Sequence, residues 1–185
     1  MLDSSGATTS APMLYVSPMQ VNFLVPPGVN AGQATVTIAS QSGTPALVHS
    51  AQIEIASVAP GIFTLNSAGL AAAYAVRVSS DGTQTLEPAY TTQNGALVAS
   101  PIDLGSATDQ VYLSLFGTGI RAADGVAVSI QGVNAPVVYA GAQPDFAGLD
   151  QINVLLPHSL VGSGPVTLVV TANQIPANEV TVTIE

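Results

Sequence analysis

One seven-residue segment occurs twice in the chain, as Gln20–Pro26 and again as Gln151–Pro157, 131 positions later. Four of the seven residues are identical, and the other three exchange one apolar residue for another. Both copies therefore share the same alternation of side chains, and both end at a proline, which stops a strand. A Gly-led strand rich in Thr and Val follows each copy. The repeat predicts a protein built from two related β units. Because the alternation is the same, we expect Val21, Phe23 and Val25 to be buried in the first unit as Ile152, Val154 and Leu156 are in the second.

Alternation of apolar and polar residues continues through most of the chain, which predicts strands buried on one face. The clearest examples are 111–116, 126–130 and 180–184. Turn signals between the strands leave no gap long enough for a crossover helix. The Ala-rich run Ala68–Val78 is the one candidate helix, but its ending before a Ser-Ser-Asp-Gly turn favours a hairpin closing at Thr83–Leu86. We therefore expect an all-β fold of antiparallel sandwich strands.

The composition restricts the partners of the protein. The 185 residues include no lysine, two arginines and eleven carboxylates, for a net charge of -9. Such a chain repels nucleic-acid phosphates and anionic lipid, so we expect no nucleic-acid partner. The hydrophobic content of 48% is ample for a core. The surface must then be wetted by Ser, Thr, Asn and Gln, which is typical of secreted and cell-surface β proteins.

The sequence contains no cysteine and no recognisable targeting segment. Cysteine is absent, which excludes disulfides and thiolate metal sites. Residues 1–10 lack the basic and apolar regions of a signal peptide, and no run of 18 apolar residues occurs. We expect no membrane insertion, and an exported form of the protein would correspond to a mature fragment.

The strands of the second half follow one another in a specific order. A strand running into a Gly-x-Gly turn, a Gly-marked hairpin, an Ile-x-Val-x-x-Pro strand and a Gly-x-Val-x-Val strand occupy 111–120, 126–132, 151–157 and 164–170. This order resembles the IPT/TIG immunoglobulin-like domain. Further motifs are Tyr15-Val-Ser-Pro18, Ala59-Pro-Gly-Ile-Phe63, Pro101-Ile-Asp103, Leu115-Phe-Gly-Thr-Gly-Ile-Arg121, Tyr139-Ala-Gly141 and Gly148-Leu-Asp-Gln-Ile-Asn153. With these, residues 12–185 resemble the Solibacter-type C-terminal domain family of large acidobacterial proteins. The resemblance implies an exported, multi-domain context and brings no catalytic residues.

The two units differ in completeness. We expect residues 1–57 to form an N-terminally incomplete immunoglobulin-like unit with a flexible segment 1–13, and residues 58–185 a complete unit with an extra N-terminal hairpin. The apolar face that includes Val21, Phe23 and Val25 has no second sheet of its own. Leaving such side chains wet costs several kcal/mol at about 25 cal/mol per Å². The hairpin 68–86, a second copy of the chain or an upstream segment are the candidates to cover it.

Two sets of polar residues are candidate ligand sites. Gln20 and Asn22 project from the polar face of their strand, and Gln151 and Asn153 do the same in the second copy. A sugar ligand is one interpretation, and hydrogen bonds to the backbone of an adjacent loop are the structural one, which the repetition favours. The second set, Asp145 and Asp150, flanks an insertion that the first unit lacks. Two carboxylates in a Gly-containing loop suggest Ca²⁺, but the Asp-x-Asp-x-Asp-Gly pattern is missing, which favours a solvated loop.

The remaining polar residues give no catalytic pattern. His49 and His158 lie outside any hydrolase motif, and we expect both in exposed loops, His49 in the turn region 41–50. The expected charge partners of Arg77 and Arg121 are Glu87 and Asp124.

The turn at Gly117 and Gly119 precedes no helix, so it is no phosphate loop, and at least one of these glycines is predicted to have positive φ.

These observations predict a non-catalytic structural or adhesion module on the outside of the cell, with no cofactor and no metal. The partners expected are other protein chains, including copies of itself. One alternative is a self-assembling fibre subunit, in which residues 1–13 of one copy complete the first unit of another by strand addition. The other alternative is a carbohydrate-binding appendage, which the absence of Trp disfavours. An exposed aromatic platform for a glycan would have to be built from the five tyrosines, namely Tyr15, Tyr74, Tyr90, Tyr112 and Tyr139.

Overall fold

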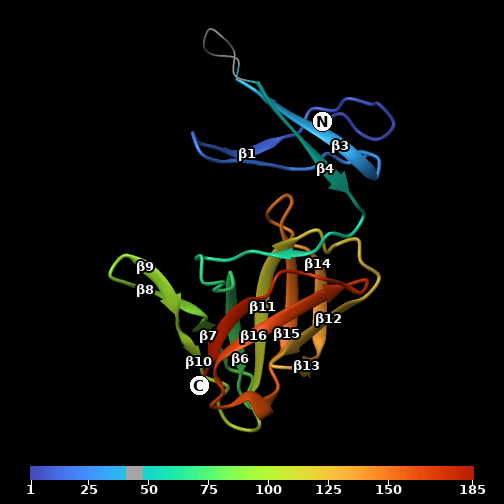
Figure 1. Cartoon of the computed structure of the whole chain (residues 1–185). Helices are drawn as coiled ribbons and strands as arrows, with labels where there is room; N and C mark the ends of the chain where they lie inside the picture. The colour runs from blue at the N-terminus through green and yellow to red at the C-terminus, as the bar shows by residue number, and fades with distance from the viewer. Residues whose placement is uncertain (41–47) are drawn as a thin grey trace. The chain divides into compact units, whose positions relative to one another are not determined.

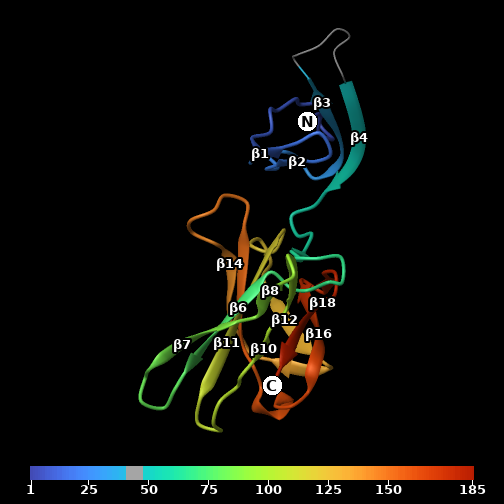
Figure 2. The same cartoon turned by 90° about the vertical axis from the view of Figure 1, so that its left-hand side faces the viewer.

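The computed structural model describes residues 1–40 and 48–185, which form strands joined by turns (Figures 1 and 2). Their single helical element is a short 3-10 helix, η1 (His158–Leu160). The predicted all-β class is thus confirmed. Within the described part of the chain, no helix has the length and apolar character needed to cross a membrane. The chain separates into unit 1 (Met1–Ser57) and unit 2 (Val58–Glu185), which are described separately.

Unit 1 contains two antiparallel hairpins, each a two-stranded sheet (Figure 1). Their strands are β1 (Met13–Val16), β2 (Val21–Phe23), β3 (Gly32–Ala39) and β4 (Val48–Ile55). Among the residues of unit 1 that the structure describes, only Asp3, Pro26 and Ala34 are buried. Unit 1 therefore has almost no closed apolar core of its own.

The N-terminal segment, expected to be flexible over 1–13, makes hydrogen bonds to β3 and to the residues just before it. Leu2 and Thr35 exchange backbone hydrogen bonds of 2.9 and 2.8 Å. The Asp3 carboxylate accepts hydrogen bonds from the N–H groups of Ser5, Ala7 and Asn30 and from two of their side chains. These bonds, the one from the Asn30 backbone first, hold the pKa of Asp3 far below its usual range.

Unit 2 contains two six-stranded sheets and one separate hairpin. The first sheet has the order β14-β15-β11-β6-β7, with β5 pairing β11, and the second has the order β10-β18-β16-β12-β13, with β17 pairing β16. The strands of the first sheet are β5 (Gly61–Ile62), β6 (Ala73–Val78), β7 (Gln84–Pro88), β11 (Gln110–Thr118), β14 (Val137–Ala142) and β15 (Asp150–Leu155). Those of the second are β10 (Pro101–Ile102), β12 (Val126–Ile130), β13 (Val133–Ala135), β16 (Gly164–Ala172), β17 (Ile175–Pro176) and β18 (Val180–Ile184), and the separate hairpin is β8 (Tyr90–Gln93) with β9 (Ala96–Ala99).

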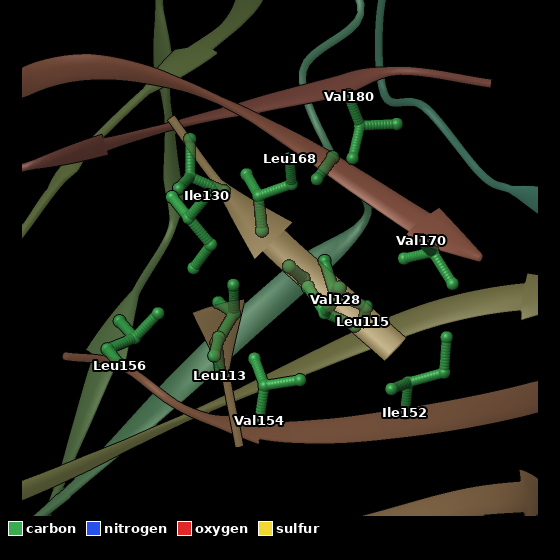
Figure 3. Close-up of a cluster of buried hydrophobic side chains, with 14 of the residues drawn as sticks. Leu113, Leu115, Val128, Ile130, Ile152, Val154, Leu156, Leu168, Val170 and Val180 are labelled. Carbon is green, nitrogen blue, oxygen red and sulfur yellow. The ribbon is translucent and has the colours of Figure 1, made fainter. Parts of the chain in front are cut away.

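The core of unit 2 lies between these two sheets. Alternate residues of β11 and β15 point at alternate residues of β12, β16 and β18, as Figure 3 shows. The labelled side chains are at most 2% exposed. This arrangement is consistent with a β-sandwich, because two sheets bury one face each against a shared apolar layer.

The Ala-rich run forms a strand, as its sequence predicted. β6 and β7 pair as a hairpin, and β6 also pairs with β11, so the hairpin is an edge of the first sheet of unit 2. Ala73 and Ala75 are buried in the unit 2 core. The hairpin is thus a part of unit 2.

The duplication extends to the pairing register of the two units. Tyr15 faces Asn22 across β1 and β2, and Tyr139 faces Asn153 across β14 and β15, with an irregularity at the same place in each pair. The hydrogen bond from Leu24 N–H to the Pro12 carbonyl measures 2.9 Å, as does the matching bond from Leu155 to Pro136. The β3–β4 hairpin also matches, since Gly32 faces Ile55 as Gly164 faces Ile184. The strands β1 to β4 therefore correspond to β14, β15, β16 and β18.

The matched strands differ in burial, and here the sequence-based prediction was wrong. Ile152, Val154 and Leu156 are buried as expected. Their counterparts are not: Val21 and Phe23 are half-buried, and Val25 is 44% exposed. The physical reason is that the second six-stranded sheet covers this face of β15, whereas the described residues of unit 1 form only two-stranded sheets.

The two glycines of the Gly-Thr-Gly turn are needed because the backbone of residues 59–62 lies close to them. Gly119 has φ of +72°, which confirms the predicted positive φ. A Cβ atom on Gly119 would collide with the carbonyl oxygen of Ala59, and one on Gly117 would collide with that of Gly61. Both glycines therefore let residues 59–62 lie along the end of β11.

Candidate functional site

In each of the two repeated amide pairs, the glutamine donates a hydrogen bond to the asparagine two residues later. Gln20 Nε2 donates to Asn22 Oδ1 at 2.7 Å, and Gln151 Nε2 donates to Asn153 Oδ1 at 2.8 Å. We expected these side chains to bond to the backbone of a loop, but in both copies the glutamine and the asparagine bond to each other. The pair in unit 1 is exposed, and the pair in unit 2 is half-buried.

The two aspartates of the insertion have separate roles. Asp150 is fully buried and accepts hydrogen bonds from Ile120 N–H at 2.7 Å, Arg121 N–H at 3.1 Å and Arg121 Nε at 2.6 Å. Asp145 is exposed and interacts with Gln143. Asp150 thus anchors the turn after β11 and is not paired with Asp145. No group of three His, Asp or Glu side chains suited to a metal ion occurs in the described ranges 1–40 and 48–185.

The arginines form ion pairs within unit 2. Arg77 contacts Glu87 at 3.1 Å, as predicted, and also Asp103 at 2.8 Å. Arg121 pairs with Asp150 and not with Asp124, which corrects the prediction. The partner was missed because Arg121 and Asp150 are distant in sequence and meet only through the register in which Gly117 faces Asp150.

The histidines also differ from the prediction. His49 is exposed but lies in β4, and of the expected turn 41–50 the positions 41–47 are outside the described residues. His158 begins η1, is half-buried, and its Nε2 lies 2.9 Å from the carbonyl oxygen of Asp109. Hydrogen bonds from Ser106, side chain first, lower the pKa of Asp109, and the nearby charges of Arg77 and His158 lower it further.

One feature that sequence reasoning missed is a row of outward side chains across the first sheet of unit 2. Leu113 and Val154 point into the core, so their neighbours along the strands point outward. The register places these outward residues in one line, namely Tyr139, Asn153, Ser114, Tyr74 and Pro88. The rows on either side are Gly141, Gln151 and Phe116, and Leu155, Tyr112, Val76 and Leu86. We call these three rows the tyrosine face.

The tyrosine face is aromatic, polar and uncharged. Its rows, all within the described residues, contain no Asp, Glu, Lys or Arg. The rings of Tyr74 and Phe116 are in tilted contact, with centroids 5.8 Å apart. The Tyr139 ring lies over Gly141, because a Cβ on that glycine would be 3.1 Å from the Tyr139 hydroxyl. The Gln151–Asn153 amide pair lies among these rings.

A pocket opens at one end of the tyrosine face. It has a volume of about 460 Å³ and is lined by Tyr74, Leu86, Pro88 and Tyr90. All four side chains are exposed. The pocket joins the first sheet to the β8–β9 hairpin, since Tyr90 is the first residue of β8.

The face can bind a ligand by stacking and by hydrogen bonds. Tyrosine rings supply flat apolar area and a polar hydroxyl, and the amide pair supplies donors and acceptors. Such a surface suits a neutral ligand with both apolar faces and hydroxyl groups.

Comparison of the chain with protein-family models, with curated proteins and with solved structures gave no match.

Proposed function

We propose that this protein is a non-catalytic extracellular adhesion module built from tandem immunoglobulin-like units of the IPT/TIG kind. The register that β1 and β2 share with β14 and β15 supports the tandem arrangement. The ion pairs that hold three of the charged side chains of unit 2 support a non-catalytic role. Arg77, Arg121 and Asp150 are held in ion pairs within unit 2, where they stabilise the fold.

The observation that carries the proposal is the tyrosine face. Tyr74, Tyr112 and Tyr139 come from three strands and reach one uncharged surface. The net charge of -9 means that the protein repels acidic ligands. A neutral ligand is therefore compatible with the uncharged tyrosine face and with the acidic surface around it.

A neutral carbohydrate is the ligand class that this surface supports best. A sugar ring has an apolar face that stacks on an aromatic ring, and its hydroxyl groups bond to amides such as Gln151 and Asn153. From the sequence, carbohydrate binding was disfavoured by the absence of Trp. Three tyrosines on one sheet, with a pocket at Tyr74 and Tyr90, supply an aromatic platform without Trp.

Titration with neutral oligosaccharides tests the proposal. The full-length protein is titrated with soluble hexose oligosaccharides of α and β linkage, and binding is followed by changes in its ¹H–¹⁵N spectrum. We expect shifts at residues of the tyrosine face, and at least tenfold weaker binding for Tyr74→Ala. The matched control is Tyr15→Ala, an exposed tyrosine in unit 1, which should leave the affinity unchanged.

Two results would contradict carbohydrate binding at this face. The first is a set of spectra that does not change with any of these oligosaccharides. The second is binding that Tyr15→Ala and Tyr74→Ala weaken to the same extent.

A further inference from the structure

The corresponding strands of the two units differ in what lies along one edge. In unit 2, β15 pairs with β14 on one side and with β11 on the other. In unit 1, β2 pairs with β1 in the register of β14, and the described residues contain no strand on the side where β11 would lie. By comparison with unit 2, an antiparallel strand equivalent to β11 would pair with the free edge of β2.

The backbone groups at this edge can be identified from the repeat. Leu24 N–H bonds to Pro12, toward β1. Neighbouring N–H groups alternate in direction along a strand, so those of Val25, Phe23 and Val21 point toward the free edge. In unit 2, the counterpart of Val25 is Leu156, whose N–H donates to the carbonyl of Val111 in β11 at 2.8 Å.

The apolar side chains behind the edge are also uncovered. Val25 is 44% exposed, whereas Leu156 is 2% exposed because β11 and the second sheet cover it. The same contrast occurs in the next strand, where Ile38 of β3 is 40% exposed and its counterpart Val170 of β16 is fully buried. An edge with both unpaired backbone groups and exposed apolar residues recruits a strand.

We propose that the free edge of β2 is an acceptor for an antiparallel strand of the β11 kind, supplied by a partner polypeptide. The matching strand has about six residues with apolar side chains at alternate positions, as Val111, Leu113 and Leu115 have in β11. It is neutral or basic, because Asp3 and Glu54 are the only charged side chains of unit 1. This acceptor is independent of the tyrosine face, since it lies in unit 1.

A second copy of the chain is a poor donor. Its own β11 is central in a sheet, paired with β6 and β15, and cannot be released without unfolding unit 2. Its residues 1–9 are held by hydrogen bonds of Leu2 to Thr35 in β3 and of Asp3 to Asn30. They also lack the alternation of β11, with Leu2 as their only branched apolar residue. The structure thus disfavours a second copy as the source of the strand.

The experiment uses the full-length protein and a synthetic peptide with the sequence of residues 110–121. The readout is the hydrogen exchange of individual amides by NMR. We expect saturating peptide to slow exchange at least tenfold for the amides of Val21, Phe23 and Val25. A control peptide with Leu113→Asn and Leu115→Asn should give no protection, because it keeps the length but not the apolar face.

Two variants of the protein locate the site. Val25→Lys places a charge in the apolar face of the acceptor and should weaken peptide binding at least tenfold. Asn22→Lys adds the same charge to the opposite face of β2 and should change the affinity less than twofold. Both positions are exposed, so neither substitution removes a buried side chain.

Three outcomes would overturn the proposal. One is a failure of the peptide to protect any amide of unit 1. Another is equal binding of the two peptides, which indicates non-specific association. The third is a dimer in which the same three amides of unit 1 are protected without peptide, because the occupant would then be a second copy.

Discussion

Replacement of Asp150 by Ala should destabilise unit 2 more than any other single loss of charge in the chain. The carboxylate is fully buried, and it accepts two backbone N–H groups and the Nε of Arg121. It thereby fixes the turn after β11 to the start of β15.

The magnitude follows from what the substitution leaves behind. The N–H of Ile120 is deeply buried and would lose its acceptor, at a cost of about 1–3 kcal/mol. The side chain of Arg121 is 43% exposed and regains water, so the lost ion pair contributes only about 0.2–1 kcal/mol. We expect a total decrease in the free energy of unfolding of about 1–4 kcal/mol.

The assay is urea unfolding followed by ¹H–¹⁵N spectra, which report the residues of unit 2 separately from those of unit 1. Asp145→Ala is the matched control, because this exposed aspartate belongs to the same insertion, and it should change the stability by less than about 0.5 kcal/mol. Asp150→Asn keeps one acceptor oxygen and should lie between the two. If Asp150→Ala and Asp145→Ala have equal stabilities, the buried network does not stabilise the turn and the reasoning is wrong.

Two further predictions concern the turns of the two units. Gly119→Val should destabilise unit 2 by more than about 1 kcal/mol in a thermal melt, because a side chain there is strained and collides with Ala59; an unchanged melting temperature would contradict the close approach. The lowered pKa of Asp3 means that its ionised form stabilises unit 1 above the unfolded value of about 3.9, and that this stability is lost as the pH falls toward the folded pKa. Asp3→Asn should therefore lower the amide protection of unit 1 at pH 7 and have a clearly smaller effect near pH 2, and an equal effect at both pH values would refute it.

The strand class and the duplication could be predicted because both depend on local pattern. The alternation in Gln20–Pro26 and Gln151–Pro157 fixes which residues point to the same side, and the structure keeps even the irregularity of pairing in both units. The positive φ at Gly119 was predictable for the same reason, since a strand that turns sharply needs a residue without Cβ.

The features that were missed depend on register between distant strands. The pairing of Arg121 with Asp150 follows from Gly117 facing Asp150, which no local pattern reveals. The tyrosine face likewise needs the alignment of four neighbouring strands before Tyr74 and Tyr139 share a row. The burial of Val25 was predicted wrongly because alternation shows which face a residue is on, not whether anything covers that face.

The hydrogen bonds of the N-terminal segment were not predicted, although they had a local signal. Asp3 is followed by Ser5 and Gly6, a combination that closes a turn through the aspartate side chain. A threonine-rich composition suggested flexibility, but the hydrogen bonds of Asp3 to Asn30 hold this segment in place.

The position of β18 determines how unit 2 resists tension. This strand is bonded to β16 on one side and to β10 on the other, and Thr181 also exchanges backbone hydrogen bonds with Gly69 and Ala71. Antiparallel hydrogen bonds are perpendicular to their strands, so a pull along β18 shears all of its bonds to β16 at once. A hairpin pulled apart at its open end, such as β1–β2, loses its pairs one after another. Under a pull along β18, unit 2 would therefore open only when many bonds break together.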